Sequence, residues 1–232
     1  MNWKKLQNGS DIRGVALEGI EGENVNLTEE VIMTIGKSFV CWLRKTMGVE
    51  NPTIAVGMDC RLSGNAIKGA FIKGAAEAGA NVVDCGLAST PAMVMTTISD
   101  TVKATASVMV TASHLPFNRN GLKFFTPKGG LDSKDIAAIL EIAENGEYAY
   151  DGAKGNATVM DFMSVYSHHI ADYIRESVKA DDYDHPLKGM HIIVDAGNGN
   201  GGFFEKILRS LGANTEGSQF LEPDGHFPNH IP

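Results

Sequence analysis

Cysteine is scarce in this sequence of 232 residues, which contains only Cys41, Cys60 and Cys85. The three are widely spaced and form no C-x-x-C pair, so the sequence indicates neither a zinc site nor a disulfide framework. We expect reduced, buried thiols, as is usual in a cytoplasmic protein.

Long hydrophobic runs are also missing. No stretch approaches the roughly 20 apolar residues that a membrane span needs, and the first residues, MNWKKLQNGSD, lack the apolar core of a signal peptide. Basic residues are outnumbered, with 20 Lys and Arg against 28 Asp and Glu and a net charge of −8. We therefore expect no membrane or nucleic-acid partner, and any anionic ligand must meet a local cationic pocket.

The sequence does contain enough apolar residues, 43%, to bury a sizeable core in one large or two modest domains. Apolar spacing alternates between the strand and helix periods along the chain. This alternation is typical of a sheet with helices packed on it. It predicts strands at 53–57, 80–85, 106–110, 121–126 and 190–194, and helices at 28–46, 65–78, 92–98, 133–144, 161–179 and from 203 to about 211.

The segment 104–125 gathers the most reactive side chains. The buried strand 106–110 breaks into a loop with Ser113 and His114, and the strand that follows carries Lys123. In open α/β sheets, ligands bind where loops leave the strand ends. A hydroxyl, a cation and a proton acceptor are what phosphoryl transfer needs. No G-x-S-x-G motif is present, so a hydrolase triad is not supported.

Residues 111–125, TASHLPFNRNGLKFF, resemble the active-site serine loop of the α-D-phosphohexomutases, the phosphoglucomutase/phosphomannomutase family. That pattern is T-[AG]-S-H-N-P followed by N-G-x-K. The resemblance implies that Ser113 is phosphorylated and that Lys123 is a general acid/base. It implies that His114 orients the loop or contacts a phosphate, and that Asn120 helps to bind substrate or phosphate. Leu115 departs from the pattern, because the family has asparagine there.

Two further stretches of the first half carry the resemblance. S-D-I-R-G at 10–14 is similar to a family D-I-R-G, which implies that Arg13 contacts the phosphoserine loop or the substrate. The segment 57–63 matches G-x-D-x-R-x-S, although Met58 stands where the family often has arginine. We expect Asp59 and Arg61 to pair and shape a loop, with phosphate binding by Arg61 as the alternative.

The second half resembles the family at V-D-x-G-N-G, residues 194–199, and at D-G-x-F-P-N-H-x-P, residues 224–232. Gly197, Gly199 and Gly202 also satisfy G-x-G-x-x-G between a predicted strand and helix, which leaves a dinucleotide-binding domain as an alternative. A faint repeat relates 53–82 to 191–215. It favours two related units in series.

The polar, glycine-rich segment 145–156 predicts the domain boundary. We expect an α/β protein of two consecutive related domains, 1–150 and 156–232, with mixed sheets flanked by helices. By resemblance, the second domain is truncated at its C-terminus, because the family's D-x-D-x-D-R magnesium loop and its later sugar-reading domains are missing. Ser113, through its phosphate, is then the single metal ligand that this chain supplies.

The resemblance implies a cytoplasmic enzyme that moves a phosphoryl group between C1 and C6 of a hexose phosphate. Phospho-Ser113, Mg²⁺ and a hexose 1,6-bisphosphate activator would take part, and these 232 residues alone would have little or no mutase activity. The alternative from another class is a non-catalytic phosphosugar-binding or regulatory module. The sequence leaves the sugar open between glucose, mannose and glucosamine phosphates, and it leaves the oligomeric state open.

Overall fold

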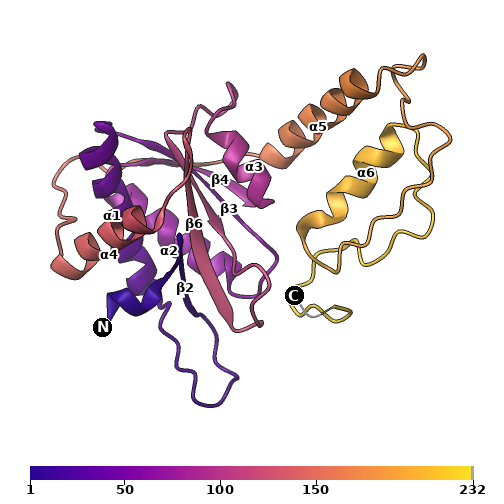
Figure 1. Cartoon of the computed structure of the whole chain (residues 1–232). Coiled ribbons are helices and arrows are strands. Elements are labelled where there is room, and N and C mark those ends of the chain that lie inside the picture. The colour runs from indigo at the N-terminus through magenta and orange to yellow at the C-terminus, as the bar shows by residue number, and fades with distance from the viewer. Residues whose placement is uncertain (231–232) are drawn as a thin grey trace.

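The computed structural model describes residues 1–230, so the last two residues of the 224–232 stretch lie outside it. Within these residues one mixed sheet of eight strands forms the centre of the larger lobe (Figure 1). The order is β1 (Gln7–Asn8), β2 (Asp11–Val15), β6 (Arg119–Thr126), β5 (Ala106–Val110), β3 (Thr53–Met58), β4 (Asn81–Leu87) and β8 (Ala157–Val159), with β7 (Gly129–Gly130) beside β6. Strands β3 and β4 pair in parallel, as do β3 and β5, whereas β6 runs antiparallel to both β5 and β2.

Helices cover both faces of this sheet (Figure 1). One face carries α1 (Glu29–Met47), α2 (Gly64–Glu77) and α4 (Ser133–Asn145), and the other carries α3 (Thr90–Thr96). The core under α1 and α2 contains the aromatic pair Phe39 and Phe124, whose ring centroids lie 4.7 Å apart. The predicted α/β class with a mixed sheet flanked by helices is therefore confirmed.

Helix ends follow the local sequence. Thr28 caps α1 by accepting a hydrogen bond from the Val31 N–H, and Gly48 ends the helix in the left-handed conformation that glycine adopts readily. Asp132 caps α4 through a capping box with Asp135. These stop signals act within a few residues, which explains why the predicted bounds of both helices are confirmed to within two residues.

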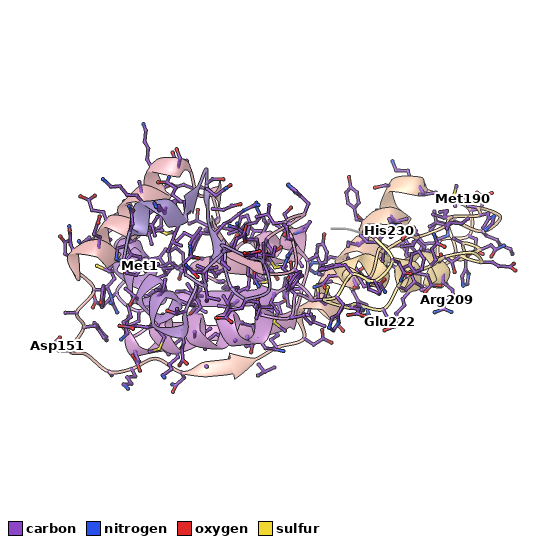
Figure 2. All side chains as sticks on the ribbon, turned by 90° about the horizontal axis from the view of Figure 1, so that it is seen from below. Met1, Asp151, Met190, Arg209, Glu222 and His230 are labelled. Atoms are coloured by element: carbon purple, nitrogen blue, oxygen red, sulfur yellow. The ribbon has the colours of Figure 1, made fainter. Side chains whose placement is uncertain are left out.

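The smaller lobe contains α5 (Phe162–Val178) and α6 (Phe203–Ser210), together with the short 3₁₀ turn η2 (Asn200–Gly202). Figure 2 shows Met190, Arg209, Glu222 and His230 in this lobe, with Met1 and Asp151 in the larger one. Another 3₁₀ turn, η1 (Trp3–Leu6), lies near the N-terminus.

The prediction of a strand at 190–194 is wrong for the described chain. This segment forms one isolated parallel bridge, His191 with Asn214, and the residue after it forms another, Asp195 with Gln219. A single pair of short strands is marginal in water, and the partner segment 214–219 is polar. The smaller lobe therefore has no strand ladder of its own among residues 162–230.

The larger lobe also extends past the glycine-rich segment. Strand β8 joins the sheet through parallel pairing with β4, and Phe162, at the start of α5, is buried against Met93 and its neighbours. The sheet thus takes up residues that follow the expected boundary at 145–156. No helix within residues 1–230 has both the length and the apolar character that crossing a membrane requires.

The thiols differ in environment. Cys85 is buried, whereas Cys41 and Cys60 are partly exposed, so the prediction of three buried thiols is correct only for Cys85. Burial raises the pKa of the Cys85 thiol to about 12. Because the thiolate is the reactive form, we expect iodoacetamide at pH 8 to leave Cys85 unmodified in the native protein and to modify it in denaturant. Peptide mass spectrometry measures this, and native-state labelling of Cys85 would contradict it.

Candidate active site

Ser113 lies on an exposed loop directly after β5. Its backbone adopts a left-handed conformation with φ of 60°, which is uncommon for a residue other than glycine. Its N–H donates to the Thr111 hydroxyl at 3.0 Å, and the Leu115 N–H donates to the Ala112 carbonyl at 3.2 Å. This tight turn presents the serine side chain to solvent, and His114 beside it is exposed as well.

Arg61 supports this loop through hydrogen bonds from its guanidinium. Its side chain is buried, and its two terminal nitrogens donate to four backbone carbonyls. Nη2 reaches Ser113 at 2.8 Å and Leu115 at 2.7 Å, while Nη1 reaches Pro116 at 2.8 Å and Arg119 at 3.2 Å. The planar fork of a guanidinium fits such a set of acceptors. We therefore assign Arg61 to positioning the serine loop rather than to direct phosphate contact.

Asp59 completes the support. Its Oδ2 lies 3.4 Å from Arg61 Nε and accepts the Thr111 hydroxyl at 2.6 Å, and its Oδ1 accepts the Arg61 N–H. The predicted pairing of Asp59 with Arg61 is confirmed. Burial raises the pKa of the Asp59 carboxyl even though Thr111 and Arg61 hydrogen-bond to it, and burial lowers the pKa of Arg61.

Strands β2 and β6 bring two cations to one carboxylate beside the loop. Asp11 pairs across the sheet with Lys123, and its Oδ2 lies 2.7 Å from Lys123 Nζ and 2.8 Å from Arg13 Nη2. Arg13 Nη1 also donates to the carbonyl of Ala112, the residue before Ser113, at 3.4 Å. Arg13 thus contacts the residue before Ser113, and Lys123 is linked to Arg13 through the shared Asp11 carboxylate.

Gly121 makes the path of Arg13 possible. It faces Arg13 across the β2–β6 pair, and a Cβ at this position would overlap the Ile12 carbonyl and lie 2.9 Å from Arg13 Cγ. The arginine crosses β6 where there is no side chain, and this crossing explains the glycine of the N-G-x-K pattern.

Asn120 is engaged inside the protein at both ends of its side chain. It has no exposed surface, its Nδ2 donates to the Ser63 hydroxyl at 2.8 Å, and its Oδ1 accepts the Gly121 N–H at 2.8 Å. These bonds make Asn120 a support of the β6 start, and its role in substrate or phosphate binding stays a prediction.

Two carboxylates of the site were not predicted from the sequence. Asp11 was not predicted, although the alternation of a strand places it on the same face as Arg13. Glu23 holds the far end of the serine loop, with Arg119 Nη2 at 2.6 Å and Asn118 Nδ2 at 2.8 Å. The hydrogen bond from Arg119 lowers the pKa of Glu23. Nothing local in the sequence connects Glu23 to a segment so far along the chain.

The glycine-rich turn 197–202 packs against the larger lobe. Asn200 Nδ2 donates to the carbonyls of Met58 at 3.1 Å and Ala88 at 2.7 Å, and the Cys60 thiol donates to the Asn198 carbonyl. A Cβ at Gly202 would overlap the Leu221 carbonyl. This close approach accounts for Gly202, and the left-handed φ of 52° accounts for Gly197, without a bound dinucleotide.

Within residues 1–230 no group of three or more His, Cys, Asp or Glu side chains could hold a metal ion. Ser113, through a phosphate, would offer one oxygen, whereas Mg²⁺ takes six ligands in near-octahedral geometry. The described residues therefore do not make a magnesium site by themselves.

The fold and this site define an α/β protein with an exposed serine on the loop after a central strand, and with an arginine that contacts that loop and shares a carboxylate with a lysine. The family model described as "Phosphoglucomutase/phosphomannomutase, alpha/beta/alpha domain I" matches residues 4–150, more than half of the chain. The chain belongs to the phosphoglucomutase/phosphomannomutase family, and the resemblance read from the motifs is confirmed.

The relatives agree. The chain is 33% identical over 217 residues to a phosphoglucomutase of Neisseria meningitidis, covering 93% of this chain and 43% of the relative. It is also 33% identical over 232 residues to a phosphoglucomutase/phosphomannomutase of Thermococcus kodakarensis, covering 98% and 47%. A crystal structure of a family protein from Burkholderia thailandensis matches with a TM-score of 0.73 and 26% identity, over 97% of this chain and 45% of that one. The chain thus spans less than half the length of these relatives.

Proposed function

We propose that this chain carries the phosphoryl-transfer serine of a phosphohexomutase. The observation that supports the proposal is the exposed Ser113, on a loop whose Ala112 carbonyl accepts a hydrogen bond from Arg13, while Arg13 and Lys123 share the carboxylate of Asp11. Cationic side chains near a nucleophilic oxygen can stabilise the negative charge of a transferring phosphoryl group. The substrate would be a hexose phosphate, and a hexose 1,6-bisphosphate would load the serine. The enzyme would be located in the cytoplasm.

In the transfer, a sugar hydroxyl attacks the phosphorus of phospho-Ser113, the new sugar O–P bond forms, and the Ser113 O–P bond breaks. Lys123, as the neutral amine, takes the proton of the sugar hydroxyl, and the ammonium so formed returns a proton to the Ser113 oxygen, which leaves as a hydroxyl. The return step reverses these events with the other phosphoryl group. Arg13 remains a cation beside the phosphate, and His114 orients the loop or contacts a phosphate. Mg²⁺, when present, would neutralise phosphate charge, with ligands beyond those described here.

Loading of the serine tests the proposal. We expect purified protein incubated with glucose 1,6-bisphosphate and Mg²⁺ to gain one phosphate by intact-mass spectrometry, located at Ser113 by peptide mapping. Ser113→Ala should gain none, whereas the control Ser177→Ala, at an exposed position on α5, should be loaded like the parent. A parent protein without the adduct, or an adduct that persists in Ser113→Ala, would contradict the proposal.

The same samples separate this proposal from a non-catalytic phosphosugar-binding module. Such a module would be stabilised by a hexose phosphate in thermal unfolding but would form no covalent adduct. We expect mutase turnover by these residues alone to be feeble, so adduct formation, rather than turnover, is the decisive measurement.

A further inference from the structure

The segment 222–230 of the smaller lobe, called the tail below, lies against Arg61, the residue that supports the serine loop. Gly225 forms a parallel bridge with Arg61, and a Cβ at Gly225 would overlap the Cys60 carbonyl and lie 2.8 Å from the Leu62 nitrogen. Figure 2 shows Glu222 and His230, which bracket this tail, nearer to the larger lobe than Met190. The tail therefore approaches the β3–α2 turn as closely as two backbones allow.

The side chain of Phe227 extends this contact to the guanidinium. The Arg61 Cζ lies 5.6 Å from the centroid of the Phe227 ring, within the range of a cation–π interaction. The same guanidinium donates to the carbonyls of Ser113 and Leu115. Arg61 is thus shared between the tail of one lobe and the reactive loop of the other.

Asn198 fixes the tail at its other side. It is buried, its Nδ2 donates to the Glu222 carbonyl at 3.0 Å, and its Oδ1 accepts from Asn229 Nδ2 at 2.8 Å. Its carbonyl accepts both the Asp224 N–H and the Cys60 thiol. Because these hydrogen bonds fix the conformation of the tail, they also fix the position of Phe227 relative to Arg61.

We propose that Phe227 is a positioning residue for Ser113, acting through Arg61. The ring lies against the guanidinium, restricts its movement and so keeps the four hydrogen bonds to the serine loop formed. Any displacement of the smaller lobe would loosen the serine turn. The catalytic consequence rests on the proposed phosphoryl transfer, whereas the coupling between tail and loop does not.

Amide hydrogen exchange of the serine loop tests the coupling directly, on the protein as it stands. In Phe227→Leu we expect the protected amides of Leu115 and Arg119 to exchange about two- to fivefold faster, the factor that a modest cation–π contact corresponds to. Phe227→Tyr keeps an aromatic face and should restore parental exchange. Phe204→Leu, at a partly exposed phenylalanine on α6, is the matched control and should leave the loop unchanged.

Phosphate loading of Ser113 is the second measurement. Phe227→Leu should load more slowly by a similar factor, with a melting temperature close to that of the parent. Unchanged exchange of Leu115 and Arg119 in Phe227→Leu would overturn the inference, as would equal effects of the leucine and tyrosine variants. If exchange responds as expected but the parent never takes up phosphate, the proposed function fails while the coupling stands.

Discussion

Replacing Lys123 by methionine is expected to slow phosphoryl transfer between Ser113 and a hexose phosphate by about 10²–10⁴-fold, the range of a general acid/base contribution. Methionine keeps the length of the side chain and removes both the charge and the proton carrier. The partner of Lys123, Asp11, retains Arg13 as a counter-ion, so the β2–β6 pair should still form.

Rapid-quench mass spectrometry of the phospho-Ser113 adduct measures the transfer rate in both directions. Lys128→Met is the matched control, because Lys128 is an exposed lysine just after the same strand, and it should transfer at the parental rate. Lys123→Arg separates the two roles, since it keeps the cation but is a poor proton carrier. Transfer within threefold of the parent in Lys123→Met would exclude Lys123 from the chemistry.

The sequence was most informative where the signals are local. The cap at Thr28, the stop at Gly48 and the apolar spacing between them define α1, and the structure has the helix there. The serine loop was recognisable for the same reason, because Ser113 and Lys123 lie within one short motif.

Local sequence signals could not predict that Arg13 and Lys123 share the carboxylate of Asp11. Asp11 and Lys123 are 112 positions apart and meet only because β2 pairs with β6 in one register. A shift of one residue would turn Lys123 to the opposite face. Asn120 belongs to the same motif as Lys123, but the two residues are three positions apart on β6 and therefore point to opposite faces of the sheet. Membership of the motif did not reveal that Asn120 is buried.

The prediction of a second sheet was wrong for a thermodynamic reason. Its predicted strand 190–194 has the right apolar pattern, but a strand is stable only when neighbours on the sheet bury its faces. The described neighbour, 214–219, is polar and meets it at isolated bridges. Propensity alone does not supply the missing partners.

The other large effect concerns stability. Arg61→Ala is expected to lower the free energy of unfolding by about 3–5 kcal/mol, the usual cost of removing one partner from a buried ion pair. The change leaves the Asp59 carboxylate without its guanidinium and four loop carbonyls without their donors. Urea denaturation followed by tryptophan fluorescence measures the loss. Lys103→Ala, which removes an exposed ion pair with Asp100, should cost almost nothing.

The loss should depend on pH, because burial already raises the pKa of Asp59 in the folded protein. Without Arg61 that pKa rises further above the unfolded value of about 3.9. A folded-state pKa raised above the unfolded value makes ionisation costly, so the penalty is absent below the unfolded pKa and complete above the folded one. Arg61→Ala should therefore be less destabilised at pH 5 than at pH 8.

A double variant identifies the source of that penalty. Asp59→Asn removes the stranded charge, so Arg61→Ala combined with Asp59→Asn should recover part of the loss at pH 8 and should lose its dependence on pH between 5 and 8. The residual loss then measures the four carbonyls and the packing of the arginine stem. An equal loss at both pH values in Arg61→Ala would contradict the role assigned to the Asp59 charge, and would leave the loop carbonyls and the packing of the arginine stem as the source of the cost.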